Sequence, residues 1–288
     1  MLIGGMNHPA RDIASELKWM SELELDFVDL TLEPPAASPW NIQPAEIKRR
    51  LQDLGMGVVG HTAYYLPIGS AFESIRRAAS EELKRCVDIF AHLGARWMNI
   101  HPDSHVPFHD HAFAIQRNVQ TLQEVLAVAD GLGIGLMLEN VPGKFNSAEQ
   151  LGEVLDALPE LGLHLDIGHC NLLTDHNTSP EILNRFSSRL RHVHLHDNKG
   201  GSADLHLPLG TGTLEVAKHV TLLRQSGYDG TVTLEVFSED RHYFAHSRDV
   251  LRERWDAAGK VSSPAGRSLE PAALGNCSNL VSPALKAG

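Results

Sequence analysis

Residues 192–199 read HVHLHDNK, and residues 204–210 read DLHLPLG. In the first stretch apolar and imidazole side chains alternate, which is typical of a strand with one packed face and one face lining a site. The second stretch holds an Asp-x-His pair in a loop that ends in glycine. Together they predict a strand whose carboxyl end leads into a metal-binding loop.

The chain on either side of this stretch repeats one unit, a short apolar run followed by a longer amphipathic segment. The apolar runs predict strands at residues 2–6, 26–32, 56–60, 97–100, 134–138, 161–165, 190–195 and 231–234. Apolar residues at helical spacing, with proline at starts and glycine at ends, predict helices at residues 10–23, 43–54, 71–93, 111–132, 147–158, 180–186, 213–226 and 246–257.

Eight strand–helix units with continuously apolar strands predict a parallel sheet that closes into a (β/α)₈ TIM barrel, an α/β fold. The alternative, an open doubly wound sheet, needs a G-x-G-x-x-G turn after its first strand, and GGMNHP at residues 4–9 does not supply it. We therefore predict one metal-dependent catalytic barrel domain, residues 1–258. Residues 259–288 are rich in Ser, Pro, Ala and Gly and are predicted to form a disordered tail.

The composition argues against several classes of protein. The formal net charge of −11 over 288 residues disfavours a nucleic-acid partner, because such proteins usually present a basic face to the phosphates. Cys86, Cys170 and Cys277 form no C-x-x-C pair, so they predict neither a disulfide framework nor a thiolate zinc site. No signal peptide and no apolar run of about 20 residues is visible, so we expect a cytoplasmic protein without a membrane segment.

Nine histidines and carboxylates lie at or just beyond the predicted strand ends. In a TIM barrel the carboxyl ends of the strands form one rim and carry the function, so we expect these side chains to meet. Carboxylates can bridge two ions and each imidazole nitrogen binds one, which suits the set to two or three Zn²⁺ or Mn²⁺ ions. The predicted metal ligands are His61, His101, Glu139, Asp166, His169, His194, Asp204, His206 and Glu235.

In order and spacing these motifs resemble the xylose isomerase-like TIM barrel superfamily, over residues 1–255. The resemblance rests on HTAY at 61–64, NIHPDSH at 99–105, LEN at 138–140, DIGH at 166–169, HLHD at 194–197, DLH at 204–206, LGTG at 209–212 and LE at 234–235. The superfamily includes sugar isomerases and epimerases and the endonuclease IV type of abasic-site DNA repair enzyme. The resemblance implies that all nine residues match the trinuclear zinc ligands of the latter. It also implies that Glu139, Asp166, His194 and Glu235 match the single-metal set of the former.

The resemblance leaves two chemistries open. An isomerase-like site would use one Mn²⁺ or Mg²⁺ to polarise a substrate carbonyl, while the Glu139 and Glu235 carboxylates move a proton through an enediolate and His169 hydrogen-bonds the sugar. An endonuclease-like site would use clustered Zn²⁺ ions to activate a water for attack on a phosphoester. The loop at residues 33–40 is proline-rich and acidic where DNA binding needs basic or intercalating side chains. We therefore predict an isomerase or epimerase of a small sugar or sugar phosphate, with a di- or trinuclear phosphoesterase as the alternative.

Four further residues are predicted to contact the substrate. Tyr64 resembles a residue that the endonuclease branch inserts at the lesion, and a tyrosine suits a sugar site equally. Lys199 and Arg241 lie in rim loops and could bind a phosphate or carboxylate, the alternative being solvated loop charge. His196 lies on the strand face of His194 and could orient Asp204 or a substrate group. The sequence leaves open the substrate, the number of ions from one to three, and whether the chain forms a homo-oligomer.

Overall fold

A computed structural model describes residues 1–261, and its centre is a closed barrel of eight parallel strands. β1 pairs with both β2 and β8, which closes the barrel and excludes the open doubly wound sheet. The strands are β1 (Leu2–Met6), β2 (Phe27–Leu32), β3 (Gly57–Thr62), β4 (Trp97–Ile100), β5 (Gly135–Glu139), β6 (Gly162–Asp166), β7 (Leu190–Leu195) and β8 (Thr231–Leu234). The predicted (β/α)₈ fold is confirmed.

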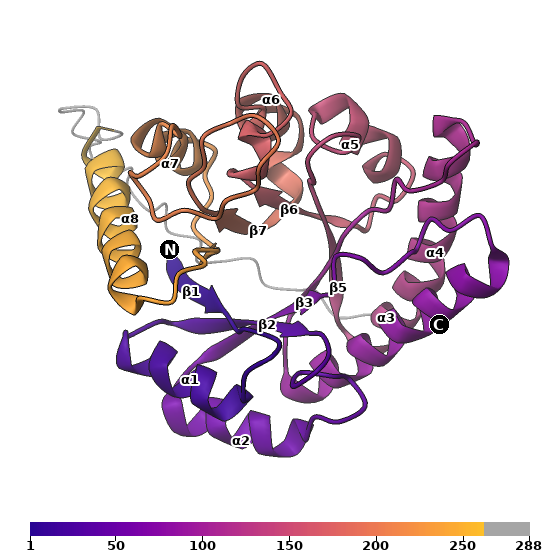
Figure 1. The fold of residues 1–288 in the computed structure, drawn as a ribbon, viewed down its shortest axis with the longest axis horizontal. Helices are drawn as coiled ribbons and strands as arrows, with labels where there is room; N and C mark the ends of the chain where they lie inside the picture. Colours follow the sequence, from indigo (N-terminus) through magenta and orange to yellow (C-terminus); the bar gives the residue numbers. More distant parts are fainter. Residues whose placement is uncertain (262–288) are drawn as a thin grey trace, which may run out of the picture.

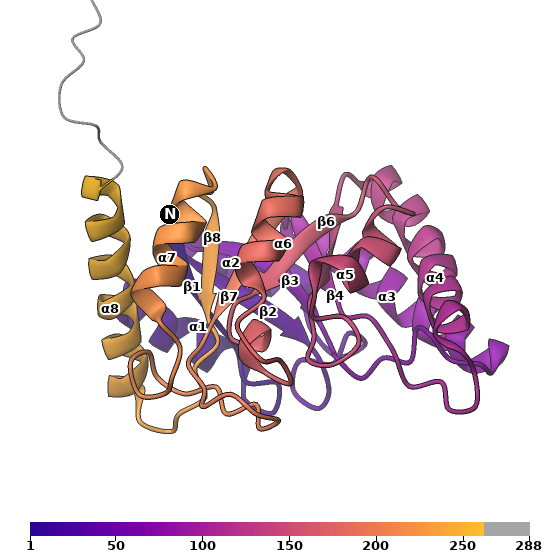
Figure 2. The ribbon, with the colours of Figure 1, turned by 90° about the horizontal axis from the view of Figure 1, so that it is seen from above.

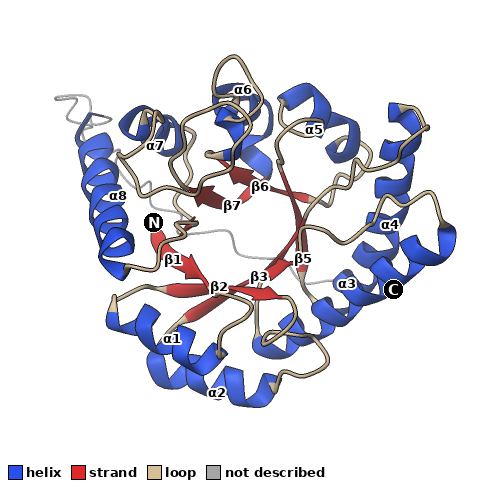
Figure 3. Cartoon of the chain, in the orientation of Figure 1, coloured by secondary structure: helices blue, strands red, loops and turns tan. Residues whose placement is uncertain are grey.

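In the described part of the chain, eight helices surround the barrel (Figure 1, Figure 3). Gly55, Gly94 and Gly133 end three of them in the left-handed conformation, as the predicted glycine stops require. The helices are α1 (Ile13–Glu22), α2 (Pro44–Leu54), α3 (Glu73–Leu93), α4 (His111–Leu132), α5 (Ala148–Leu155), α6 (Ser179–Phe186), α7 (Val216–Gln225) and α8 (Arg241–Val261).

The last helix differs from its predicted range. It begins at Arg241 because the Asp240 carboxylate accepts the backbone N–H of His242, and the Asp240 carbonyl accepts that of Tyr243. It runs to Val261, so the predicted domain boundary at residue 258 lies within its last turn. The rest of the predicted disordered tail, residues 262–288, lies outside the described residues. Within residues 1–261, none of the helices combines the length and apolar character needed to cross a membrane.

The barrel interior is filled in layers. Toward the amino end it holds a small apolar cluster, separate from the main core between strands and helices: Phe27, Val59, Met137 and the partly buried Trp97. Two glycines make room for its rings, since an added Cβ would lie 2.4 Å from Phe27 at Gly4 and 2.1 Å from Trp97 at Gly135. Buried polar side chains fill the carboxyl half of the barrel interior. The long loops gather at this end of the barrel (Figure 2).

Candidate metal centre

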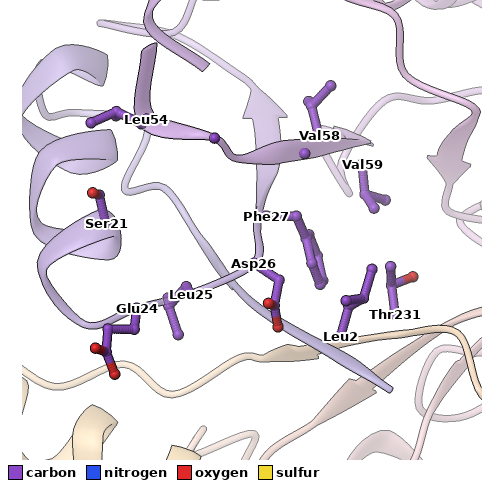
Figure 4. A pocket seen from close by; sticks show the side chains of 12 residues that line it. Leu2, Ser21, Glu24, Leu25, Asp26, Phe27, Leu54, Val58, Val59 and Thr231 are labelled. Carbon is purple, nitrogen blue, oxygen red and sulfur yellow. The ribbon is translucent and has the colours of Figure 1, made fainter. Parts of the chain in front are cut away.

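A cavity of about 510 Å³ opens at the amino end of the barrel (Figure 4). It is lined by the first residues of four strands, Leu2, Phe27, Gly57 and Thr231. Function in TIM barrels lies at the opposite end, on the loops that follow the strands. The predicted site residues are at that opposite end, so this cavity is not the candidate site.

The structure brings the nine predicted metal ligands together at the carboxyl end of the barrel. Their donor atoms fall into groups whose members all lie within 4.8 Å of one another. The groups share Glu139, Asp166, His169 and His196, which makes the cluster continuous. The groups are His61, His101 and Glu139; Glu139, Asp166 and His194; His169, His196, Asp204 and His206; Asp166, His169, His196 and Glu235; and His164, His192 and His194.

We call Glu139, Asp166 and His194, together with the neighbouring Glu235, the central group; its carboxylates surround one imidazole nitrogen. His194 Nδ1, at the end of β7, lies 3.1 Å from Glu235 Oε2, 3.8 Å from Asp166 Oδ2 and 3.9 Å from Glu139 Oε1. All four side chains are buried. Ligands bound about 2.1 Å from one tetrahedral ion lie roughly 3.4 Å from one another, so this spacing fits a shared cation.

The second group is His61 on β3, His101 just after β4, and Glu139 at the end of β5. His101 Nε2 is 2.9 Å, and His61 Nε2 is 3.7 Å, from Glu139 Oε2. The Asn99 amide donates to the same oxygen at 2.6 Å and fixes the carboxylate. Burial by itself would raise the pKa of Glu139, but the neighbouring His164 and His101 hold it well below its usual value. Glu139 is therefore an ionised acceptor.

The third group is His169, His196, Asp204 and His206, which lie in the turn after β6 and the loop after β7. Asp204 Oδ2 lies 3.1 Å from both His169 Nε2 and His206 Nε2. His196 Nε2 lies 3.7 Å from Asp204 Oδ1 and 3.4 Å from Asp166 Oδ1. His196 is fully buried, so the structure places this predicted substrate residue among the donors, where it can ligate or orient Asp204.

Three buried polar atoms without a hydrogen-bond partner test whether the donor atoms fit a metal ion. Buried polar atoms are normally hydrogen-bonded, and an unpaired one often marks a missing water or ion. His61 Nε2, Asp166 Oδ2 and His196 Nε2 are buried and have no hydrogen-bond partner. One belongs to each of the three groups described above. Imidazole and carboxylate donors together suit Zn²⁺ or Mn²⁺, so the residues fit a divalent cation in each group.

The carboxylates also favour the protonated form of two histidines, His194 and His206. Burial by itself lowers the pKa of His194, but Glu235 and Asp29 beside the ring raise it well above its usual value. His206 is affected in the same way, since Glu235 and Asp204 outweigh burial and raise its pKa to about 9. A divalent cation can take the place of such protons, because metal binding requires deprotonated imidazole.

The remaining predicted substrate residues lie at or beyond the mouth of the cluster. Tyr64 is 72% exposed, and its ring centre lies 6.5 Å from that of His101. Lys199 is exposed in the loop after β7. Arg241 places its guanidinium 4.8 Å from the ring centre of Trp19 on α1. Tyr64 is therefore the one of these three with a contact to the donor cluster.

Several residues that shape the site were not singled out from the sequence. Asp29 on β2 contacts His194, Asn99 on β4 contacts Glu139, and His164 and His192 lie below the donors. Asp197 organises the loop that carries Asp204 and His206. Asn99, His192 and Asp197 lie in stretches quoted from the sequence, where they were given no role. A signal was also present for the other two, since Asp29 interrupts the apolar run FVDLTL and His164 lies two residues before Asp166, on the same strand face.

Comparison with known proteins identifies the family to which the chain is similar. Residues 17–254 match the model of the family described as xylose isomerase-like TIM barrel. A ketose 3-epimerase of Arthrobacter globiformis is 28% identical over 218 residues, covering 72% of this chain and 73% of that protein. A protein of Thermotoga maritima named "Probable endonuclease 4" is 31% identical over 171 residues, covering 53% and 58%.

The fold is shared with solved structures as well. The crystal structure of a D-tagatose 3-epimerase-like protein superposes with a TM-score of 0.81. The match covers 91% of this chain and 100% of that chain at 23% identity. At this identity the likeness shows the fold, and the chemistry has to be argued from the side chains at the carboxyl end.

Proposed function

The chain belongs to the xylose isomerase-like TIM barrel family, and we propose that it is a metal-dependent sugar epimerase or isomerase. The observation that carries the proposal is the central group, in which His194 Nδ1 faces the carboxylates of Glu139, Asp166 and Glu235. These residues would hold one divalent cation. The cation would polarise a substrate carbonyl and so acidify the neighbouring C–H bond.

In this proposal Glu139 and Glu235 move the proton. Glu139 ends β5 and Glu235 follows β8, and these strands are not neighbours in the barrel, so the two carboxylates approach the mouth from different sides. One carboxylate would remove the proton next to the carbonyl, and the other would return a proton to the opposite face of the planar enediol. Return to the opposite face inverts the carbon, which is epimerisation. Return to the other carbon of the enediol gives isomerisation.

The surrounding residues would bind and orient a polyhydroxylated substrate. His169 lies at the edge of the central group, with its Nδ1 atom 3.4 Å from both Glu139 Oε1 and Asp166 Oδ2. Where it binds no ion, its Nε2 atom can accept a hydrogen bond from a sugar hydroxyl. Tyr64 at the mouth offers an aromatic face to a sugar ring. We keep Lys199 and Arg241 as proposed rim contacts for a substrate phosphate or carboxylate.

Solvent exchange tests this function. In D₂O, the protein should exchange the proton next to the carbonyl of one member of a ketose panel, as followed by NMR. Removal of metal with a chelator should abolish exchange, and Mn²⁺ or Zn²⁺ should restore it, because the carboxylates alone act on a much weaker carbon acid. Exchange that survives complete metal removal would contradict the proposal.

A second candidate function is a di- or trinuclear phosphoesterase of the endonuclease IV type. The observation that favours it is the whole cluster, because a one-metal enzyme does not need the groups built on His61 and His101 or on Asp204 and His206. Clustered cations could activate a water and stabilise the leaving alkoxide of a phosphoester. The net charge of −11 weighs against a DNA substrate.

Metal stoichiometry separates the two candidates. Elemental analysis of protein purified without chelators would be compared with that of His61→Ala and His206→Ala. Two or three ions per chain, with one lost in each variant, together with cleavage of a phosphodiester, would favour the second candidate. One ion that survives both substitutions would place it on Glu139, Asp166, His194 and Glu235, as the epimerase proposal requires.

A further inference from the structure

A second polar layer lies inside the barrel, next to the carboxylates and nearer the amino end. Side chains two residues apart on a strand face the same way. His164 and His192 are register partners on β6 and β7, and they lie two residues before a second pair of partners, Asp166 and His194. Asp29 of β2 completes this layer, and its side chain is fully buried.

Asp29 is held by three donors. Its Oδ2 atom lies 2.6 Å from His194 Nε2 and 3.2 Å from His192 Nε2, and it accepts the Thr233 hydroxyl at 3.0 Å. A buried carboxylate is costly unless it is hydrogen-bonded, and when ionised it can only accept. The imidazole nitrogens that face Asp29 therefore carry protons.

This contact decides which nitrogen of His194 can bind a metal. A neutral imidazole has one N–H and one lone pair. With the proton at Nε2 against Asp29, the lone pair is at Nδ1. Nδ1 is the atom that faces Glu139, Asp166 and Glu235. The ring thus connects the buried carboxylate to the centre of the donor cluster.

Two other histidines of the cluster are fixed differently. His169 Nδ1 donates to the Asn140 carbonyl at 3.0 Å, and His206 Nδ1 donates to the Glu235 carbonyl at 3.1 Å. In both rings a backbone carbonyl holds the proton at Nδ1 and leaves Nε2 for ligation. His194 has the reverse orientation, and its partner is a side chain. Its partner can therefore be replaced without touching a ligand.

We propose that Asp29 is the positioning residue of the central metal site. It holds the His194 proton at Nε2, fixes the ring so that Nδ1 points to the carboxylates, and makes Nδ1 a stronger donor, as carboxylate partners of metal-bound histidines do. The inference rests on the metal site of the proposed function. It does not depend on whether epimerisation or phosphoester cleavage follows.

The test is zinc affinity, measured by competition with a chromophoric chelator, for the wild type and for Asp29→Asn. The asparagine amide has nearly the shape of the aspartate carboxylate and keeps one acceptor oxygen, but it lacks the negative charge. Zinc should therefore bind to the variant about 10–100-fold more weakly than to the wild type. Asp26→Asn is the matched control, because Asp26 lies just before the same strand and accepts the Ile3 backbone N–H at 2.7 Å. The control should leave zinc affinity unchanged.

A second readout needs no variant. In zinc-loaded wild-type protein labelled at histidine, long-range ¹H–¹⁵N spectra should show His194 protonated at Nε2 and bound to zinc at Nδ1. A proton at Nδ1, or unchanged zinc affinity in Asp29→Asn, would overturn the inference while leaving the metal site intact. Wild-type protein that takes up no zinc or manganese would instead overturn the proposed function itself.

Discussion

Replacing Glu139 with glutamine is expected to slow metal-dependent exchange of the substrate proton by about 10²–10⁴-fold. Glutamine has nearly the same shape but cannot accept the proton. Its amide group would also face donors, since Asn99 donates to Glu139 Oε2 at 2.6 Å and His101 Nε2 lies 2.9 Å from it. The variant should be compared with the wild type by NMR in D₂O with added Mn²⁺ or Zn²⁺, and with its metal content determined.

The matched control for this prediction is Glu149→Gln. Glu149 lies in the first turn of α5, just beyond the same strand, and its side chain is exposed. The same chemical change there should leave the rate of proton exchange within about twofold of the wild-type rate. Exposed substitutions away from special features usually change the free energy of unfolding by less than about 0.5 kcal/mol, so the fold and the site should be unaffected. A Glu139→Gln variant that binds metal and still exchanges at the wild-type rate would remove Glu139 from the proposed proton transfer.

The second large effect is expected on folding. Asp197→Asn should lower the free energy of unfolding by about 2 kcal/mol or more, because two backbone N–H groups of the loop lose their acceptor and each such loss costs about 1–3 kcal/mol where the group is buried. In the structure the fully buried Asp197 carboxylate accepts from Gly210 and Gly212 at Oδ2 and from Asn198 and Leu214 at Oδ1, at 2.9–3.0 Å. An amide can satisfy one pair of these donors but presents its own N–H₂ to the other pair.

Denaturant unfolding of the metal-free protein would measure this change. The loop that Asp197 holds carries Asp204 and His206, so the variant should also lose the ion of the third group. Asp175→Asn is the control, because Asp175 is exposed in the loop after β6. An Asp197→Asn variant as stable as the control would show that another contact holds the loop closed.

Much of the fold could be predicted because it depends on local patterns. Helix α4 was predicted at residues 111–132 and occupies those residues, since Asp110 caps its start and Gly133 ends it. The start of α8 was predicted five residues late. There the decisive signal is one carboxylate, Asp240, which begins the helix at Arg241 before the apolar periodicity is established. Short polar caps carry less sequence signal than an apolar stripe.

The site was predictable in part for a geometric reason. Parallel strands in a barrel bring all their carboxyl ends to one rim, so a histidine or carboxylate at each strand end must lie near the others. The structure brings His61, Glu139, Asp166, His194 and the other predicted ligands into one cluster. Their assignment as ligands stays a prediction until metal is measured.

The sequence by itself determined the eight strand–helix units, the order in which they close, and the side chains that reach the rim, because periodicity and strand ends are local properties. The tertiary structure decided the rest. Register between strands and layers inside the barrel determine three features. They are the grouping of the ligands around Glu139, the contact of Asp29 with His194 from 165 residues away, and the four amides around Asp197. Those contacts join residues far apart in the chain, and burial makes the polar ones necessary, because a buried charge is tolerated only where the fold supplies its partners.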